Sequence, residues 1–167
     1  MPVPLTPDQL AAVEACRDAA RRYCRGVDRL DPDEMRSAYW PDATDDHGNF
    51  VGNAHEFVDH CMTAHLKWSW TMHTIFNHTV ELDDGTMARG EAYNVSWLQR
   101  PTGELDMWFG RYLDRYERRG DEWRIIERVC VHEGDRTLPP GDAMPIIADT
   151  FRQGDADRST PGRPLGS

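Results

Sequence analysis

Residues 70–82, WTMHTIFNHTVEL, mark the point at which the chain changes from a helical to an extended pattern. Successive side chains of a strand point to opposite faces, so this run has two distinct sides. One side carries His73, Ile75, Asn77 and Thr79. The other carries Met72, Thr74, Phe76, His78 and Val80. We therefore expect a strand whose two faces have different roles, with the His73 face lining a mixed apolar and polar pocket.

Three further strands follow at short intervals, over residues 86–99, 105–119 and 123–133. Asp83-Asp84-Gly85 is a hairpin-turn sequence, and the turns RPTGE and GDE separate the later strands. Long strands joined by tight turns predict one curled antiparallel meander.

The residues before this meander have helical patterns. Thr6 to Gln9 form a capping box with proline at the first helical position, and the helix it starts carries an apolar stripe to Val27. Asp31 begins a second, short helix through Tyr39 that Pro41 stops, and residues 42–52 are typical of a hairpin or loop. Asn53 caps a third helix.

Helices followed by a strongly bent antiparallel sheet predict an α+β fold. We expect a cone-shaped sheet with the N-terminal helices on its concave face and a small-molecule pocket at its open end. Residues 1–135 would form this single domain. Residues 136–167, rich in Pro, Gly and Asp, would be an extension with a short helix at 144–151 and a disordered end.

Composition excludes several partners. The chain has 167 residues and a net charge of −10, which disfavours nucleic acid and anionic membranes. It has no run approaching the roughly 20 apolar residues of a membrane span. Its N-terminus lacks the features of a secretory signal, and its four cysteines are scattered, so we expect a reduced, cytoplasmic protein.

The sequence also predicts no metal and no cofactor. His55, His60 and His65 are five residues apart, so they rotate off a common helix face. The run Asp45-Asp46-His47 offers ligand types, but no H-x-x-x-H or C-x-x-C accompanies it. Nucleotide-binding and serine-hydrolase motifs are absent as well.

Three segments carry a family resemblance: YCRGVDRLDPDEMRSAYWPDATDDHG from Tyr23, HTIFNHTVELDDGTMARGEAY from His73, and GRYLDRYERRGDEWRIIERV from Gly110. Over about residues 8–135 the chain resembles the SnoaL-like branch of the nuclear transport factor 2-like superfamily. That branch includes scytalone dehydratase, hexachlorocyclohexane dehydrochlorinase, bile-acid dehydratase, polyketide cyclases and relatives of ketosteroid isomerase. It also includes the non-catalytic small subunits of aromatic-ring dioxygenases, so the fold alone does not choose a function.

The resemblance to the dehydratases and the dehydrochlorinase implies a catalytic Asp28 and His73. Asp28 is otherwise badly placed, since an acid at the end of a helix opposes the helix dipole. A neutral imidazole is a suitable base near pH 7, and a carboxylate on its far nitrogen fixes the tautomer and stabilises the imidazolium. The alternative is that His73 is a core histidine and Asp28 a solvated helix end.

The resemblance suggests further substrate-binding residues. Tyr23 matches a pocket-lining position but could equally be a core aromatic. Arg128 matches a basic pocket residue, and Arg111 lies on the neighbouring strand. Each arginine could instead form a structural ion pair with Glu127, Asp114 or Glu91, and for Arg111 we favour that interpretation.

Aromatic and polar side chains complete the expected pocket. Trp40 and Trp108 are candidate walls for a flat ligand, and Asn77 shares the expected face of His73.

These features predict a cofactor-free lyase of the dehydratase or elimination type, or a related C–C lyase or isomerase, acting on a small hydrophobic cyclic or aromatic substrate. The alternative is a non-catalytic ligand-binding protein or a small subunit of an aromatic-ring dioxygenase. Met72, Phe76 and Val80 would leave the outer face of the sheet apolar, so we expect a homo-oligomer, a dimer or trimer, that covers it.

Overall fold

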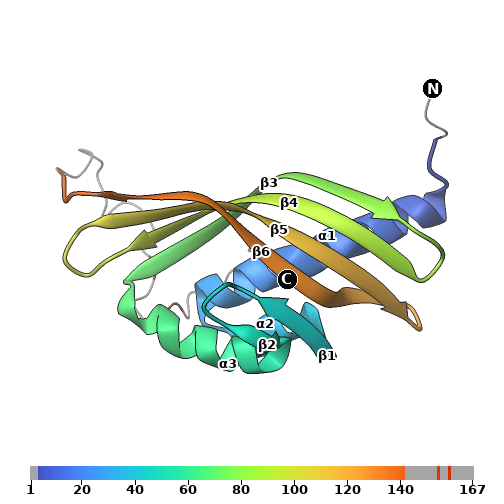
Figure 1. Cartoon of the computed structure of the whole chain (residues 1–167), viewed down its shortest axis with the longest axis horizontal. Coiled ribbons are helices and arrows are strands. Elements are labelled where there is room, and N and C mark those ends of the chain that lie inside the picture. Colours follow the sequence, from blue (N-terminus) through green and yellow to red (C-terminus); the bar gives the residue numbers. More distant parts are fainter. Residues whose placement is uncertain (1–3, 142–153, 155–157, 159–167) are drawn as a thin grey trace.

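A computed structural model describes residues 4–141, 154 and 158, and it shows an α+β fold in which a curled sheet arches over the helices (Figure 1). The helical elements are α1 (Pro7–Arg29), α2 (Pro32–Ser37), α3 (Ala54–Ala64) and the 3₁₀ turn η1 (His65–Lys67). The strands are β1 (Tyr39–Asp46), β2 (Val51–Asn53), β3 (Trp70–Leu82), β4 (Met87–Gln99), β5 (Leu105–Arg119) and β6 (Glu122–Leu138). The predicted fold class is confirmed.

The sheet has the order β2-β1-β6-β5-β4-β3. Its four long strands form the predicted antiparallel meander, and β1 joins β6 in parallel. Helix α1 packs against β3 and β6, while α2 and α3 lie below with the β1–β2 hairpin (Figure 1). Strand β3 therefore lies at one edge of the sheet, and β1 lies next to the other edge.

Helix α1 begins as the sequence predicts. The Gln9 N–H donates to Thr6 Oγ1, and the Thr6 N–H donates to Gln9 Oε1 at 2.9 Å. At the other end Gly26 allows α2 to approach, because a Cβ there would lie 2.5 Å from the backbone nitrogen of Met35. This close approach allows the chain to turn sharply after α1. Asp28, in the last turn of α1, is directed towards β3, where it accepts hydrogen bonds from Thr71 and His73.

The expected second helix ends early, at Ser37, so the prediction that it runs through Tyr39 is wrong. Tyr39 begins β1 instead, since the Ile125 N–H of β6 donates to the Ala38 carbonyl at 2.9 Å and draws this segment into the sheet. The predicted hairpin is confirmed and closes where the His47 N–H donates to the Phe50 carbonyl at 2.9 Å.

Strand β3 departs from strict alternation, because its register with β4 shifts between Ile75 and His78. The shift turns His78 inward, where its ring lies 3.3 Å from the Tyr116 hydroxyl, and leaves Asn77 exposed. The prediction that Asn77 shares a face with His73 is therefore wrong.

Strand β6 extends to Leu138, five residues beyond the predicted end of that strand. The expected helix at 144–151 and the expected disordered end lie outside the described residues. No helix of the described residues is long and apolar enough to cross a membrane.

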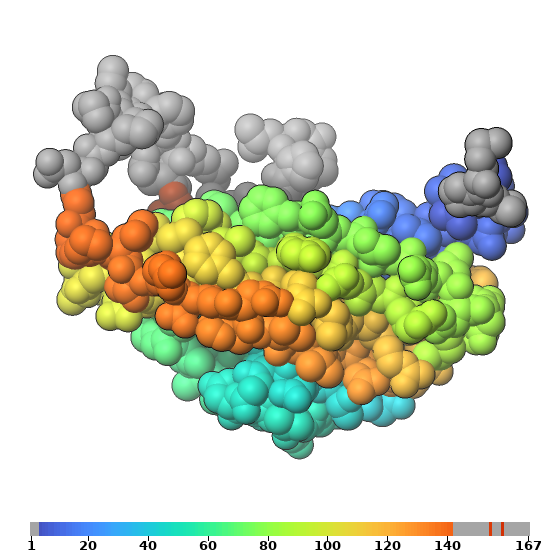
Figure 2. Space-filling view, turned by 45° about the horizontal axis from the view of Figure 1, so that its top comes forward, coloured from blue at the N-terminus to red at the C-terminus, as the bar shows by residue number. Residues whose placement is uncertain are grey.

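The outer face of the sheet is exposed, and β4, β5 and β6 lie side by side across it in lime, yellow and orange (Figure 2). It carries several exposed apolar side chains: Met72 and Phe76, each 57% accessible, and Trp70, Tyr93 and Leu113. The functional groups, by contrast, gather on the inner face.

Candidate functional site

A cavity of about 320 Å³ opens between the end of α1, helix α3 and the inner faces of the sheet. Four of the seven histidines line it: His47, His65, His73 and His132. Its walls are mainly aromatic and come from Tyr23, Phe57, Trp68, Trp108 and Tyr112. The cavity thus combines apolar walls with a few titratable groups, which is the usual composition of a small-molecule site.

Asp28 and His73 meet at this cavity, as the sequence predicted. His73 Nδ1 lies 2.7 Å from Asp28 Oδ1, and the His73 backbone N–H donates to Asp28 Oδ2 at 2.8 Å. The Thr71 hydroxyl donates to Oδ1 at 2.8 Å. Asp28 is not a solvated helix end, since its side chain is 14% accessible. The side chain of His73 is 8% accessible.

Asp28 is held ionised by this arrangement. Burial raises the pKa of its carboxyl, but the hydrogen bonds from His73 and Thr71 outweigh burial and leave the pKa below its ordinary value. An ionised carboxylate accepts a hydrogen bond from Nδ1–H, so the neutral His73 ring presents Nε2 as an acceptor. Among the described residues none bonds to Nε2, and the ring lines the cavity. The arrangement can therefore accept a proton from a bound molecule.

A second histidine–carboxylate pair lines the same cavity. His47 Nδ1 hydrogen-bonds to Asp45 Oδ1, and the Tyr39 hydroxyl donates to Asp45 Oδ2 at 2.7 Å. On its other side His47 Nε2 lies 3.1 Å from the Tyr23 hydroxyl. The ring stacks on Phe57, with centroids 4.2 Å apart, and this packing fixes its orientation.

This pair was not predicted from the sequence, because residues 45–47 were considered as a functional group only for metal binding. The spacing of two residues was the available signal, since it puts Asp45 and His47 on the same side of an extended chain.

Tyr23 fits both interpretations that the sequence left open, since it belongs to the buried core at 2% accessibility and also lines the cavity. Burial, with the neighbouring Tyr112 and Tyr39, raises the pKa of its phenol well above the ordinary value, so the hydroxyl keeps its proton. It can donate a hydrogen bond to His47 or to a bound molecule.

Arg128 lies beneath the cavity and not in its wall. Its guanidinium forms a bidentate ion pair with Asp114, at 2.7 Å for both bonds, and both side chains are fully buried. The rings of Tyr23 and Tyr112 cover it, 4.3 and 4.2 Å from the guanidinium carbon. The ion-pair interpretation is the one the structure supports, and Arg128 acts on the site by supporting these two tyrosines.

Trp108 lines the cavity as expected, whereas Trp40 lies elsewhere. The Trp40 Nε1–H donates to the Glu117 carbonyl at 2.9 Å, and Arg119 and Arg124 stack on its ring. The early start of the sheet at Tyr39 moves it there. The expectation that Trp40 forms a wall of this cavity is wrong.

Arg111 and Asn77 both face outward. Arg111 bonds Glu91 at 2.6 Å and Glu133 at 2.7 Å, which is the structural ion pair favoured from the sequence. Asn77 follows the register shift of β3 and lies on the outer face near Phe76. Neither residue touches the cavity.

His65 is a further cavity residue that the sequence did not single out. Its Nδ1–H donates to the Cys61 carbonyl at 3.0 Å, and its ring centre lies 5.7 Å from that of His73. Burial and the nearby His73 lower the pKa of His65 to about 3. His65 is therefore neutral at physiological pH and presents Nε2 as an acceptor.

Arg158 lies behind the His73–Asp28 pair. It donates to the Trp68 carbonyl at 2.6 Å and to Thr71 Oγ1 at 3.3 Å, and Thr71 in turn bonds Asp28. No pattern in the Pro- and Gly-rich C-terminal sequence indicates this contact.

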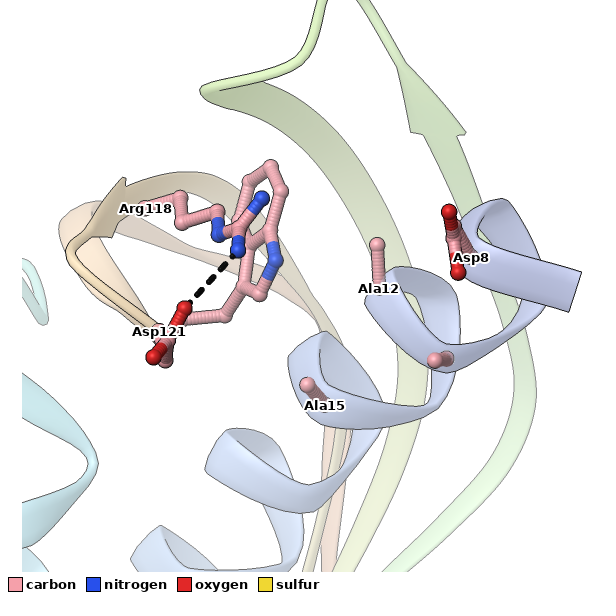
Figure 3. Close-up of a pocket in the computed structure, with 7 residues that line it drawn as sticks. Asp8, Ala12, Ala15, Arg118 and Asp121 are labelled. Atoms are coloured by element: carbon pink, nitrogen blue, oxygen red, sulfur yellow. Dashed lines mark hydrogen bonds and ion pairs between the residues drawn. The ribbon is translucent and has the colours of Figure 1, made fainter.

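A second hollow lies at the opposite end of α1, facing the β5–β6 turn (Figure 3). Ala12 and Ala15 project into it from the helix, and Arg118 and Asp121 face each other across 3.1 Å. Its charged groups from the turn are bound to each other, so it offers little chemistry. The histidine-lined cavity is the better candidate site.

Over the described part of the chain, no group of three or more His, Cys, Asp or Glu side chains is placed to hold a metal ion. The histidines of the cavity engage carboxylates and carbonyls, as described above.

The sequence pattern of the SnoaL-like domain matches residues 8–129. No curated protein matches the chain in sequence. Among solved structures, a type 2 hexachlorocyclohexane dehydrochlorinase is similar, with a TM-score of 0.74, 20% identity, and coverage of 83% of this chain and 96% of that one.

A protein from Novosphingobium aromaticivorans assigned as a scytalone dehydratase has a TM-score of 0.73 and 16% identity, and the match covers 86% of this chain and 98% of that one. A protein from the same organism, assigned as the beta subunit of an aromatic-ring-hydroxylating dioxygenase, has a TM-score of 0.62 and 19% identity. That match covers 75% of this chain and 91% of the other. At these identities the likeness establishes the fold, so function depends on the residues of the site.

Proposed function

The chain belongs to the SnoaL-like domain family, and from that premise we propose that it is a cofactor-free lyase of the elimination type. Its substrate would be a small hydrophobic cyclic or aromatic compound. The observation that carries the proposal is the His73–Asp28 pair, with Nδ1 and Oδ1 2.7 Å apart, whose histidine lines an aromatic-walled cavity and has no described partner at Nε2.

In the proposed reaction His73 Nε2 removes a proton from a carbon next to a carbonyl or an equivalent activating group. Asp28, already ionised, stabilises the imidazolium that forms. The electron pair of the C–H bond becomes the new C=C bond as the leaving group departs from the adjacent carbon. Isomerisation and C–C cleavage could begin with the same proton transfer.

The shape and polarity of the cavity support this substrate class. Its volume of about 320 Å³ suits a ligand of one to three rings, and Trp108 and Tyr112 stack with centroids 6.4 Å apart along one wall. Flat aromatic walls bind flat ligands through apolar contact and stacking.

A turnover screen tests the proposal. Hydroxylated aromatic ketones, steroids and halogenated rings would be incubated with wild type, His73→Ala and Asp28→Asn. We expect one class to be turned over, with a loss of about 10²–10⁴-fold in kcat/KM for His73→Ala. His60→Gln, on the exposed side of α3, is the matched histidine control. Turnover that survives both dyad substitutions would contradict the assignment.

A non-catalytic role as a partner of a larger oxygenase subunit is the second candidate, and the exposed apolar outer face favours it. Met72, Phe76 and Tyr93 lie on strands whose other face is already buried against helices. The same face could instead join copies of this chain, which is our proposal for a homo-oligomer. Sedimentation of a monomer at micromolar concentration would contradict the homo-oligomer, and activity of the isolated chain would contradict the purely structural role.

We also place the protein in the cytoplasm. Its four cysteines are all free, and three of them are buried. Free, buried thiols are typical of proteins from reducing compartments.

A further inference from the structure

Two histidine–carboxylate pairs meet at the cavity, each with its histidine ring in the lining. His73 lies on β3, at one end of the strand order, and His47 follows β1, near the other end. A single proton abstraction needs only one such pair. The second pair therefore calls for a role of its own.

The second pair belongs to a hydrogen-bonded chain. The Tyr39 hydroxyl and His47 Nδ1 occupy the two oxygens of Asp45, which is 1% accessible. His47 Nε2 then reaches the Tyr23 hydroxyl at 3.1 Å. The chain ends at Tyr23, which lines the same cavity as His73.

The two pairs differ in what their outer nitrogen contacts. His73 lines the cavity and has no described partner at Nε2, as a base requires, whereas His47 Nε2 is already bonded to a phenol that keeps its proton. With a proton on both ring nitrogens, His47 donates to Asp45 through Nδ1–H and to the Tyr23 oxygen through Nε2–H. The Tyr23 hydrogen is then free to point into the cavity.

We infer that Tyr23, His47 and Asp45 form the acid arm of the site, in which Tyr23 protonates the departing oxygen and His47 re-supplies Tyr23. The inference rests on the proposed lyase function and deepens it. Tyr23 touches the substrate, while His47 and Asp45 are positioning residues that act through it.

The proton balance of one turnover is complete. His73 takes the proton from carbon, the C=C bond forms and the C–O bond breaks. The leaving oxygen takes the Tyr23 proton, and Tyr23 takes the Nε2 proton of His47. The products are an unsaturated carbonyl compound and water, with His73 charged and His47 neutral. Proton exchange with solvent restores both.

This arm selects for a hydroxyl leaving group. Hydroxide leaves poorly unless a proton accompanies it, whereas a halide leaves without one. The acid arm therefore predicts that the protein is a dehydratase for β-hydroxy carbonyl compounds, and that a halide substrate would not use His47.

Two matched probes test the inference, 3-hydroxy-1-tetralone and 3-chloro-1-tetralone, which lose water or hydrogen chloride to give the same product, 1-naphthol. After subtraction of the uncatalysed rate, His47→Gln should lower kcat/KM for the hydroxy probe by about 10²-fold or more, the range of general acid catalysis. The same substitution should change kcat/KM for the chloro probe by less than about threefold, since loss of chloride needs no acid. Structural damage would lower both probes alike.

Three further variants separate the possible outcomes. His73→Ala should lower kcat/KM for both probes, and His60→Gln should lower it for neither. Tyr23→Phe should show the same selective loss as His47→Gln, and the double variant should be no worse than either single one, because the two residues act in series.

Equal losses on both probes with His47→Gln, or additive losses in the double variant, would overturn the acid arm and leave the lyase function standing. Turnover of the chloro probe alone by wild type would overturn it as well. Turnover of neither probe by wild type would overturn the acid arm together with the proposed function on this substrate class.

Discussion

Two largely buried carboxylates each have a basic partner. Asp114 pairs with Arg128 beneath the cavity, in what we call the floor, and Asp28 pairs with His73 at the cavity, in what we call the mouth. The two pairs differ in their hydrogen bonding. In the floor, Arg128 and Asp114 bond through both oxygens, the Tyr116 hydroxyl adds a third bond at 2.8 Å, and both charged side chains are fully buried. In the mouth, Asp28 accepts three hydrogen bonds, yet its partner His73 keeps one ring nitrogen for the cavity.

The difference shows how to distinguish structural from functional ion pairs in this fold. Arg128 has its guanidinium covered by Tyr23 and Tyr112, so it can offer nothing to a ligand without moving them. His73 is also mostly buried, but the open nitrogen is the one that does chemistry. Burial alone does not separate the two pairs, and neither does unused hydrogen-bonding capacity, because Arg128 Nη1 also has no partner among the described residues. They differ in access, since the Arg128 guanidinium is covered by tyrosine rings whereas the His73 ring lines the cavity.

Substitution at the mouth should give the largest effect on activity. His73→Ala is expected to reduce kcat/KM by about 10²–10⁴-fold through loss of the base. The fold should survive, because Asp28 keeps the Thr71 hydroxyl and the backbone N–H of residue 73. Steady-state kinetics and thermal unfolding of the same preparation check this. If the melting temperature fell enough to explain the loss of activity, His73 would be a structural residue, like Arg128 in the floor.

Substitution in the floor should give the largest effect on stability. Arg128→Met leaves the Asp114 charge buried without its partner, which costs about 3–5 kcal/mol of unfolding free energy. Arg128→Met with Asp114→Leu should recover much of this loss, since no charge is then left unpaired. Urea unfolding measures both variants. If Arg128→Met left stability unchanged but abolished turnover, Arg128 would be a functional residue of the site.

The pH dependence of stability should sharpen the contrast further. The pKa of His65 is lowered to about 3 in the folded chain, so between that value and 6.5 the unfolded chain binds a proton that the folded chain does not. Stability is therefore fully present above pH 6.5 and falls as the pH drops towards 3. Asp28, with its lowered pKa, adds a loss of the same sign below 3.8.

Replacing His65 by Asn should flatten the loss between pH 6.5 and 3 by a few kcal/mol, as measured by urea unfolding at several pH values. A curve parallel to that of wild type would show that His65 titrates freely in the folded chain.

The outer face should give the smallest effect. Arg111 bonds two glutamates at the surface, and exposed ion pairs contribute little. Arg111→Ala should leave melting temperature and kcat/KM unchanged within error. A clear loss of turnover would mean that the outer face communicates with the cavity.

The sequence predicted the parts of the fold that depend on local patterns. The capping box at Thr6 and the succession of four long strands joined by tight turns follow from short-range patterns, and both are confirmed. The start of β1 at Tyr39 depends instead on pairing with Ile125, some 86 positions away, and the polar run after Pro41 gave no strand signal. The register shift in β3 likewise follows from pairing and not from composition.

The site could be predicted in part for the same reason. Asp28 was conspicuous as an acid at the wrong end of a helix, and the structure brings it to His73. Asp45 and His47 looked like an ordinary polar loop, because only the tertiary fold brings Tyr23 and Tyr39 to them. Arg128 was conspicuous as a buried charge, but the partner that decides its role lies 14 residues away on β5.

Deuterium exchange into 1-tetralone tests the central claim most directly, because this ketone has an acidic C–H next to its carbonyl and no leaving group. Nuclear magnetic resonance in D₂O would follow loss of the C2 protons with wild type, His73→Ala and His47→Gln. We predict catalysed exchange by wild type and His47→Gln, and at least about 10²-fold slower exchange with His73→Ala. Exchange that is unchanged in His73→Ala, or that wild type does not accelerate, would contradict the assignment of His73 as the base.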